Sequence, residues 1–279
     1  MTDEYAWGNI LSKQLGCRVS NYGVEGYGTD QALLRFRKNS NDKSNIVFLN
    51  HLSENILRNV NQSRGLLYPG SDPGFKPRFS MMEDGTLILI PLPDLSALEF
   101  DTYMSDPSSY LNHEYFLPNG PSGIVVGRFP YSYSIVKAFS NYHLRSKLRG
   151  QPRYLDFYSS SHASNALEIT TEILVKFKQE ATNLNKVPVI SIIPTGDDLL
   201  YYSEKSIWPY HNLIKMLELK NVSVLNFGVG IIEYLDGKNP CSLFKDCSGH
   251  YNTSGYELLA RIAYQYLKAN GLIASIKNS

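Results

Sequence analysis

At positions 187–193 the chain contains the stretch Val187-Pro188-Val189-Ile190-Ser191-Ile192-Ile193. This almost continuously apolar run is typical of a strand that is buried on both faces of a parallel sheet. Helical patterns flank it. One begins with the capping residues Asn165 and Glu168, and another covers about 209–219 before a strand over 222–227. This alternation of strands and helices predicts an α/β domain with helices on both faces of the sheet.

The N-terminal part of the chain continues the same alternation. The pattern predicts, in order, a helix over 3–15, a strand over 17–22, a glycine-rich turn over 23–28, a helix from Thr29 and a strand over 46–49. We therefore expect one domain over residues 1–279, in which helices cover both faces of a parallel sheet.

Residues 64–163 do not follow this alternation of strands and helices. They hold ten of the 14 prolines and 16 of the 34 aromatic residues, too many aromatics for a disordered linker. We expect an insertion within the domain, containing a hairpin that turns at 83–85. A helix over 132–148 is predicted to turn its apolar face inward, with Ile135, Val136, Phe139 and Leu144 on that face.

Composition excludes several classes of function. The net charge is +1, so no basic excess indicates a nucleic-acid partner. The three cysteines have no metal-ligand spacing, and we expect neither a metal nor a cofactor. Cys241 and Cys247 could form a disulfide if the compartment is oxidising, but buried or free thiols are the favoured interpretation. No apolar run reaches membrane-spanning length, and the acidic, polar first residues do not fit a signal peptide. Neither the compartment nor the oligomeric state is predicted.

A candidate catalytic residue lies near the C-terminal end, in the stretch over 246–257. Ser254 and Glu257 form a Ser-x-x-Glu capping box that predicts the start of a packed helix. His250 then lies on a loop just before that helix, with Asp246 four residues upstream. A loop fixed by a helix holds an imidazole in place while its ring stays accessible, which suits a general base.

Two other loops follow predicted strands and are expected at the same sheet edge, where open α/β sheets bind ligands. The glycine-rich turn over 23–28 offers backbone N–H groups close to a substrate. The loop over 50–58 offers the side chains of Glu54 and Asn55. Together with a histidine and an acid, oxyanion donors of this kind are the machinery of acyl transfer.

These blocks resemble those of SGNH (GDSL-type) hydrolases. Residues 21–31 resemble the second conserved block of that family, 46–58 the third, and 246–255 the fifth. The resemblance implies a three-layer α/β/α sandwich with a parallel, flavodoxin-like sheet and an esterase acting on acyl or acetyl groups of a small molecule, a glycan or a lipid. It implies oxyanion-hole roles for Gly26 and for Asn55 or Glu54, with His250 as base and Asp246 as orienting acid.

The first block of the family, a strand that ends in Gly-Asp-Ser, is missing from this sequence. The resemblance places that strand between the predicted strands at 17–22 and 46–49, so we expect an incomplete N-terminus and a chain with little activity by itself. The serines at 159–161 and Ser248 lack the strand–turn–helix setting of a nucleophile, and we interpret both sites as polar loops. Adjacent Asp197 and Asp198 are interpreted as a loop or helix-start feature.

Two alternatives remain open. A non-catalytic glycan-binding or assembly module on the same fold would use the aromatic insertion to stack sugars. A nucleotide-binding domain would use Gly23, Gly26 and Gly28, which follow a strand and precede a helix. Their order is not Gly-x-Gly-x-x-Gly, and no acid ends the next strand, which weakens the second alternative.

Overall fold

The computed structural model describes residues 5–68, 70–71, 74–127, 129–139, 141–247 and 249–277. The chain divides into two compact units. The first unit comprises Met1–Gly26, Ala32–Ser53 and Leu174–Ser279, and the second comprises Tyr27–Gln31 and Glu54–Ile173. The segment predicted as an insertion, 64–163, falls wholly within the second unit.

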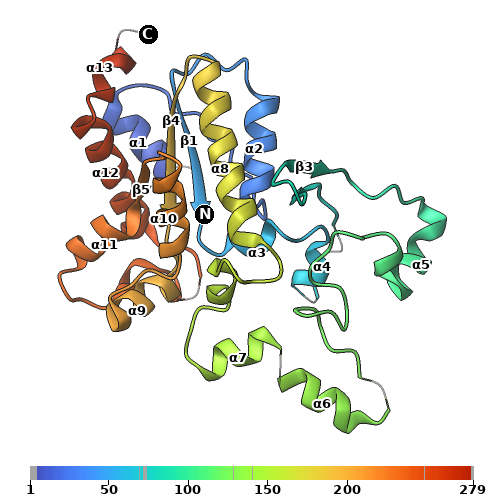
Figure 1. Ribbon diagram of the computed structural model, residues 1–279. Helices are drawn as coiled ribbons and strands as arrows, with labels where there is room; N and C mark the ends of the chain where they lie inside the picture. Colours follow the sequence, from blue (N-terminus) through green and yellow to red (C-terminus); the bar gives the residue numbers. More distant parts are fainter. Residues whose placement is uncertain are drawn as a thin grey trace. The chain divides into compact units, whose positions relative to one another are not determined.

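The first unit is built on a parallel sheet of three strands in the order β1-β4-β5 (Figure 1). The strands are β1 (Ile46–Leu52), β4 (Val187–Ile193) and β5 (Val224–Asn226). Residues 189–192 of the central strand β4 are all buried, as its apolar sequence predicts. The α/β class and the parallel sheet are therefore confirmed.

Strand β1 forms one edge of this sheet, in register with β4 from Ile46 opposite Val187 to Leu52 opposite Ile193. No strand among the described residues pairs with its other edge. The strand predicted over 17–22 is not present, because this segment has no pairing partner and remains irregular. A strand forms only where the backbone finds a neighbour to complete its ladder.

Helices cover both faces of this sheet (Figure 1). In chain order these helices are α1 (Trp7–Leu15), α2 (Thr29–Lys38), α8 (Ala166–Asn183), α9 (Gly196–Lys205), α10 (His211–Leu219), α11 (Phe227–Leu235), α12 (Thr253–Ala269) and α13 (Leu272–Lys277). On one face α1, α11 and α12 form an apolar core with the sheet, including Leu11, Val189 and Leu259. On the other face Phe36 of α2 meets Phe177 of α8 edge-on, with ring centroids 5.0 Å apart.

The second unit has short elements. They are α3 (Asn55–Arg58), α4 (Arg64–Leu67), β2 (Arg78–Met81), β3 (Leu87–Ile90), η2 (Ala97–Glu99), α5 (Phe100–Ser105), η3 (Pro107–Ser109), α6 (Tyr131–Phe139), α7 (Tyr142–Leu148) and η4 (Leu155–Tyr158). The antiparallel pairing of β2 with β3 confirms the predicted hairpin.

Buried charges organise the second unit. The ammonium of Lys76 pairs with Asp30, whose side chain is fully buried. The guanidinium of Arg78 donates to the backbone carbonyl oxygens of Val60 and His113. The Glu114 carboxylate accepts four hydrogen bonds, from the backbone N–H groups of residues 62, 63 and 116 and from the Asn61 amide. Each charge thus has partners that replace water, the condition for burying it.

The predicted helix over 132–148 is wrong in two respects. It is divided into α6 and α7, and the α6 side chains of Ile135, Val136 and Phe139 face outward instead of inward. None of the helices in the described part of the chain is both long and apolar enough to cross a membrane.

Candidate functional site

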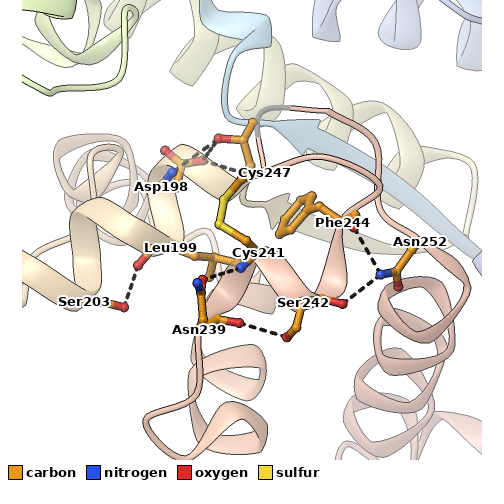
Figure 2. Close-up of a disulfide and its surroundings, with 10 residues drawn as sticks. Asp198, Leu199, Ser203, Asn239, Cys241, Ser242, Phe244, Cys247 and Asn252 are labelled. Atoms are coloured by element: carbon orange, nitrogen blue, oxygen red, sulfur yellow. Dashed lines mark hydrogen bonds between the residues drawn. A yellow bond between two sulfur atoms is a disulfide. The ribbon is translucent and has the colours of Figure 1, made fainter.

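The loop that carries His250 is tightly braced. Phe244 and Tyr251 form an antiparallel bridge, and the Lys245 N–H donates to the His250 carbonyl oxygen at 2.9 Å. Cys241 and Cys247 form a disulfide with Cα atoms 4.6 Å apart (Figure 2). The favoured expectation of free thiols at these two positions is therefore wrong. The two cysteines are six residues apart in the sequence. They meet because the helical turn η5 (Pro240–Leu243) folds the loop back on itself.

Asn252 joins this loop to α12. Its side-chain oxygen caps the helix by accepting from the Gly255 N–H at 3.0 Å. Its side-chain nitrogen donates to the carbonyl oxygens of Ser242 and Phe244, at 2.8 and 3.2 Å. The predicted capping box of Ser254 and Glu257 is therefore wrong: Asn252 is the cap, and Ser254 lies inside the helix, which begins at Thr253. One carboxamide satisfies the helix N–H and two carbonyl oxygens of the loop, whereas a hydroxyl has only one hydrogen to donate.

Two contacts place the loop at the carboxyl end of β4. The Tyr251 hydroxyl donates to the carbonyl oxygen of Pro194, the first residue after the strand, at 2.6 Å. The Cys247 carbonyl oxygen lies so close to the start of α9 that a Cβ atom at Gly196 would be 1.8 Å from it. Figure 2 shows the disulfide beside the first turn of this helix, near Asp198 and Leu199. Only glycine at position 196 leaves room for this approach.

His250 itself is exposed, and so is Asp246. No hydrogen bond or ion pair joins the two side chains in the described part of the chain. The Asp246 carboxylate instead lies against Gly249, where a Cβ atom would be 2.7 Å from both carboxylate oxygens. The ring of His250 is thus open to a substrate, and its pairing with Asp246 remains a prediction.

Gly26 lies in a turn of the first unit, as predicted, and is half-buried. Its φ of 81° is in the left-handed region that favours glycine. Upstream in the same segment, the Asn21 side chain accepts from the Gly23 N–H at 2.9 Å. Among the described residues, no acceptor is hydrogen-bonded to the Gly26 N–H.

Asn55 and Glu54 belong to the second unit and differ in their surroundings. The Glu54 carboxylate pairs with the guanidinium groups of Arg58, at 3.1 Å, and of Arg153, at 3.4 Å. Asn55 opens α3 and is 8% exposed. Its side-chain oxygen is buried and accepts no hydrogen bond from a residue that the structure describes.

A buried network that sequence analysis did not predict lies at the carboxyl ends of β1 and β4. The Ser53 hydroxyl donates to the Asp198 carboxylate, which also accepts from the Thr195 N–H at 2.7 Å. Thr195 and Asp198 form the capping box of α9, so the interpretation of Asp198 as a helix-start feature is confirmed. Thr-x-x-Asp directly after a buried strand is the sequence signal that predicts this cap.

The other candidate serines have ordinary roles. Ser159 and Ser161 hydrogen-bond each other at 2.9 Å in a polar loop. His162 bonds to Ser164 at 2.8 Å and packs against Phe157, and burial lowers its pKa. Ser248 lies outside the described residues.

An open hollow of about 510 Å³ adjoins the β2–β3 hairpin and is lined by residues that include Met81, Asp84 and His113. None of the predicted catalytic residues lines it. Comparisons with protein-family models, with curated proteins and with solved structures find no match to this chain.

Proposed function

We propose that the protein is an ester hydrolase of the SGNH type, acting on acyl or acetyl esters of a small molecule, a glycan or a lipid. The observation that carries this proposal is the position of His250. It is an exposed imidazole on a braced loop at the carboxyl end of a parallel strand, which is where open α/β sheets place their ligands. A base held in this way reaches a substrate without a change of fold.

Asn55 is the better candidate for the oxyanion-hole side chain. A carboxamide donates hydrogen bonds, whereas an ionised carboxylate only accepts them. The Glu54 carboxylate, held by Arg58 and Arg153, would repel a developing oxyanion. In this proposal the Asn55 carboxamide is the oxyanion donor of the second unit, and Glu54 positions the two arginines.

The proposed position of the nucleophile follows from the unpaired edge of β1. This strand is apolar along most of its length, Ile46-Val47-Phe48-Leu49-Asn50-His51-Leu52, a pattern typical of interior strands. A long apolar edge invites pairing with another strand. We infer that a further strand occupies this edge and, by the resemblance, carries the serine whose proton His250 removes.

The test is hydrolysis of p-nitrophenyl acetate by the protein, with His250→Ala compared with His211→Ala as a control. His211 starts α10 in the same unit and is half-buried. The control should keep its activity, whereas loss of the base should lower kcat by about 10²–10⁴-fold. A fluorophosphonate probe then locates the reactive serine by mass spectrometry. Labelling at 159–161, or full activity in His250→Ala, would contradict the proposal.

A second candidate is a non-catalytic glycan-binding or assembly module on the same fold. It is favoured by the exposed rings of Phe129, Tyr131 and Tyr133, on which sugars can stack. The same two measurements separate the candidates, because a binding module neither hydrolyses the ester nor reacts with the fluorophosphonate.

A further inference from the structure

Helix α6 of the second unit turns its apolar face to solvent. Tyr131, Ile135, Val136 and Phe139 recur at the spacing of one helix face, and all four side chains are exposed, Val136 by 69%. Phe129, just before the helix, is 88% exposed and meets Tyr131 edge-on. An ordinary surface helix does the opposite and packs its apolar stripe against the core.

Hydrogen bonds on the polar side of the helix maintain this orientation. The Lys137 ammonium donates to the Asn119 carbonyl oxygen at 2.6 Å. Just after the helix, the Asn141 amide donates to the Gly123 carbonyl oxygen at 3.0 Å. Both acceptors lie in the turn-rich segment over 117–123. The polar side therefore faces the protein and the apolar side faces outward.

The charge of this region differs from that of the whole chain. Residues 115–155 contain six lysines and arginines and no aspartate or glutamate, although the net charge of the protein is only +1. In α7 the side chains of Arg145, Lys147 and Arg149, just beyond its end, are exposed. Leu148, between the last two, is 72% exposed. Apolar and cationic side chains thus lie next to each other on one short stretch.

We propose that α6, together with Phe129 before it and the exposed residues 145 and 147–149 after it, docks onto the surface of an anionic lipid bilayer. Interfacial helices combine an apolar face that enters the headgroup boundary with basic residues that attract anionic lipids. Tyrosine is enriched at the headgroup boundary because its ring contacts apolar groups while its hydroxyl stays hydrated. Nine residues are too few to cross a bilayer, so α6 lies on the surface.

The composition favours lipid over nucleic acid. Single-stranded nucleic acid stacks its bases on aromatic rings, whereas Ile135, Val136 and Leu148 offer aliphatic surface that stacks with no base. An acyl-chain boundary accepts aliphatic and aromatic groups alike. This inference does not depend on the proposed hydrolase activity.

The test is co-sedimentation of the full chain with vesicles of phosphatidylcholine, alone or with one quarter phosphatidylglycerol. Binding should be stronger to the anionic vesicles and should fall as salt rises. The double variant K147Q/R149Q should bind them about 25-fold more weakly, since each cation near such a surface contributes about fivefold. V136S/F139S should weaken binding by at least about tenfold, because two buried apolar side chains are lost.

Matched controls lie on the surface of the first unit. Leu219→Ser removes a leucine that is 77% exposed, and Lys215→Gln removes an exposed lysine of the same helix. Both should bind vesicles like the unmodified chain. Circular dichroism of each variant confirms folding.

Three outcomes would overturn the proposal. The first is equal or absent binding to both kinds of vesicle. The second is an equal loss in the control variants. The third is self-association without lipid, measured by analytical ultracentrifugation and abolished by V136S/F139S, which would show that a second copy of the chain covers the helix.

Discussion

The two units of this protein are stabilised in contrasting ways. The first unit buries apolar side chains between a parallel sheet and long helices, as in the contact of Leu11 with the α12 side of the core. The second unit has short elements and buries charges, with Lys76 against Asp30, and with Arg78 and Glu114 bonded to backbone groups. A buried apolar side chain shares its contacts among many neighbours, whereas the buried Asp30 carboxylate is neutralised by the single ammonium of Lys76. The two units should therefore respond differently to single substitutions.

The largest effect is expected when one buried charge loses its partner. Lys76→Met leaves the Asp30 carboxylate buried and uncompensated, which should lower the free energy of unfolding by about 3–5 kcal/mol. The double variant with Asp30→Asn should recover much of this loss, because Asn keeps an acceptor for the Gln31 N–H while the charge is removed. Urea denaturation measures both. Equal stability of the single and double variants would show that the pair is not the critical contact.

In the first unit the matching experiment is a cavity. Leu259 in α12 is 1% exposed, and Leu259→Ala should lower the free energy of unfolding by about 2–5 kcal/mol, from lost burial and the cavity left behind. Leu219→Ala on the surface of α10 is the control and should stay within about 0.5 kcal/mol. If Leu259→Ala and Leu219→Ala lower the free energy of unfolding by the same amount in urea denaturation, the core around α12 is less tightly packed than the burial of Leu259 indicates.

The success of sequence analysis also differs between regions. The strand over 187–193 is predicted at its observed bounds, because an apolar strand buried on both faces needs no information beyond its own residues. The segment over 17–22 has a strand-like sequence but no strand, because pairing depends on a neighbour that its own residues do not supply. The disulfide between Cys241 and Cys247 likewise depends on the loop geometry that brings the two residues together.

The orientation of a helix face is another property that sequence periodicity does not fix. The spacing of Ile135, Val136 and Phe139 correctly predicts a helix with one apolar face. Which way that face turns depends on the hydrogen bonds of Lys137 and Asn141 to the segment over 117–123. For the candidate site, His250 is placed on its exposed loop as expected, whereas the bracing by Asn252 and the buried contact of Ser53 with Asp198 depend on three-dimensional proximity.

A pH titration extends the comparison to a buried ring in the first unit. Burial alone lowers the pKa of His51 in β1 to about 3, against about 6.5 in an unfolded chain. Between these values the unfolded state binds more protons, so the free energy of unfolding should fall as pH drops below about 6.5, by at most about 1.4 kcal/mol per pH unit. His51→Gln removes the group and should flatten this part of the profile. An unchanged slope in the variant would assign the effect to other residues.

The smallest change in the free energy of unfolding is expected from a substitution in α6, whose apolar side chains are exposed. Phe139→Ser removes a large ring from α6, yet the side chain is 60% exposed, so little apolar area returns to water on unfolding. The free energy of unfolding should change by no more than about 0.5 kcal/mol, far less than for Leu259→Ala, although phenylalanine is the larger residue. Urea denaturation at two protein concentrations provides the measurement. A loss above about 2 kcal/mol would mean that the ring is covered in the folded protein. Dependence of that loss on concentration would identify a second copy as the cover, and independence would identify another part of the same chain.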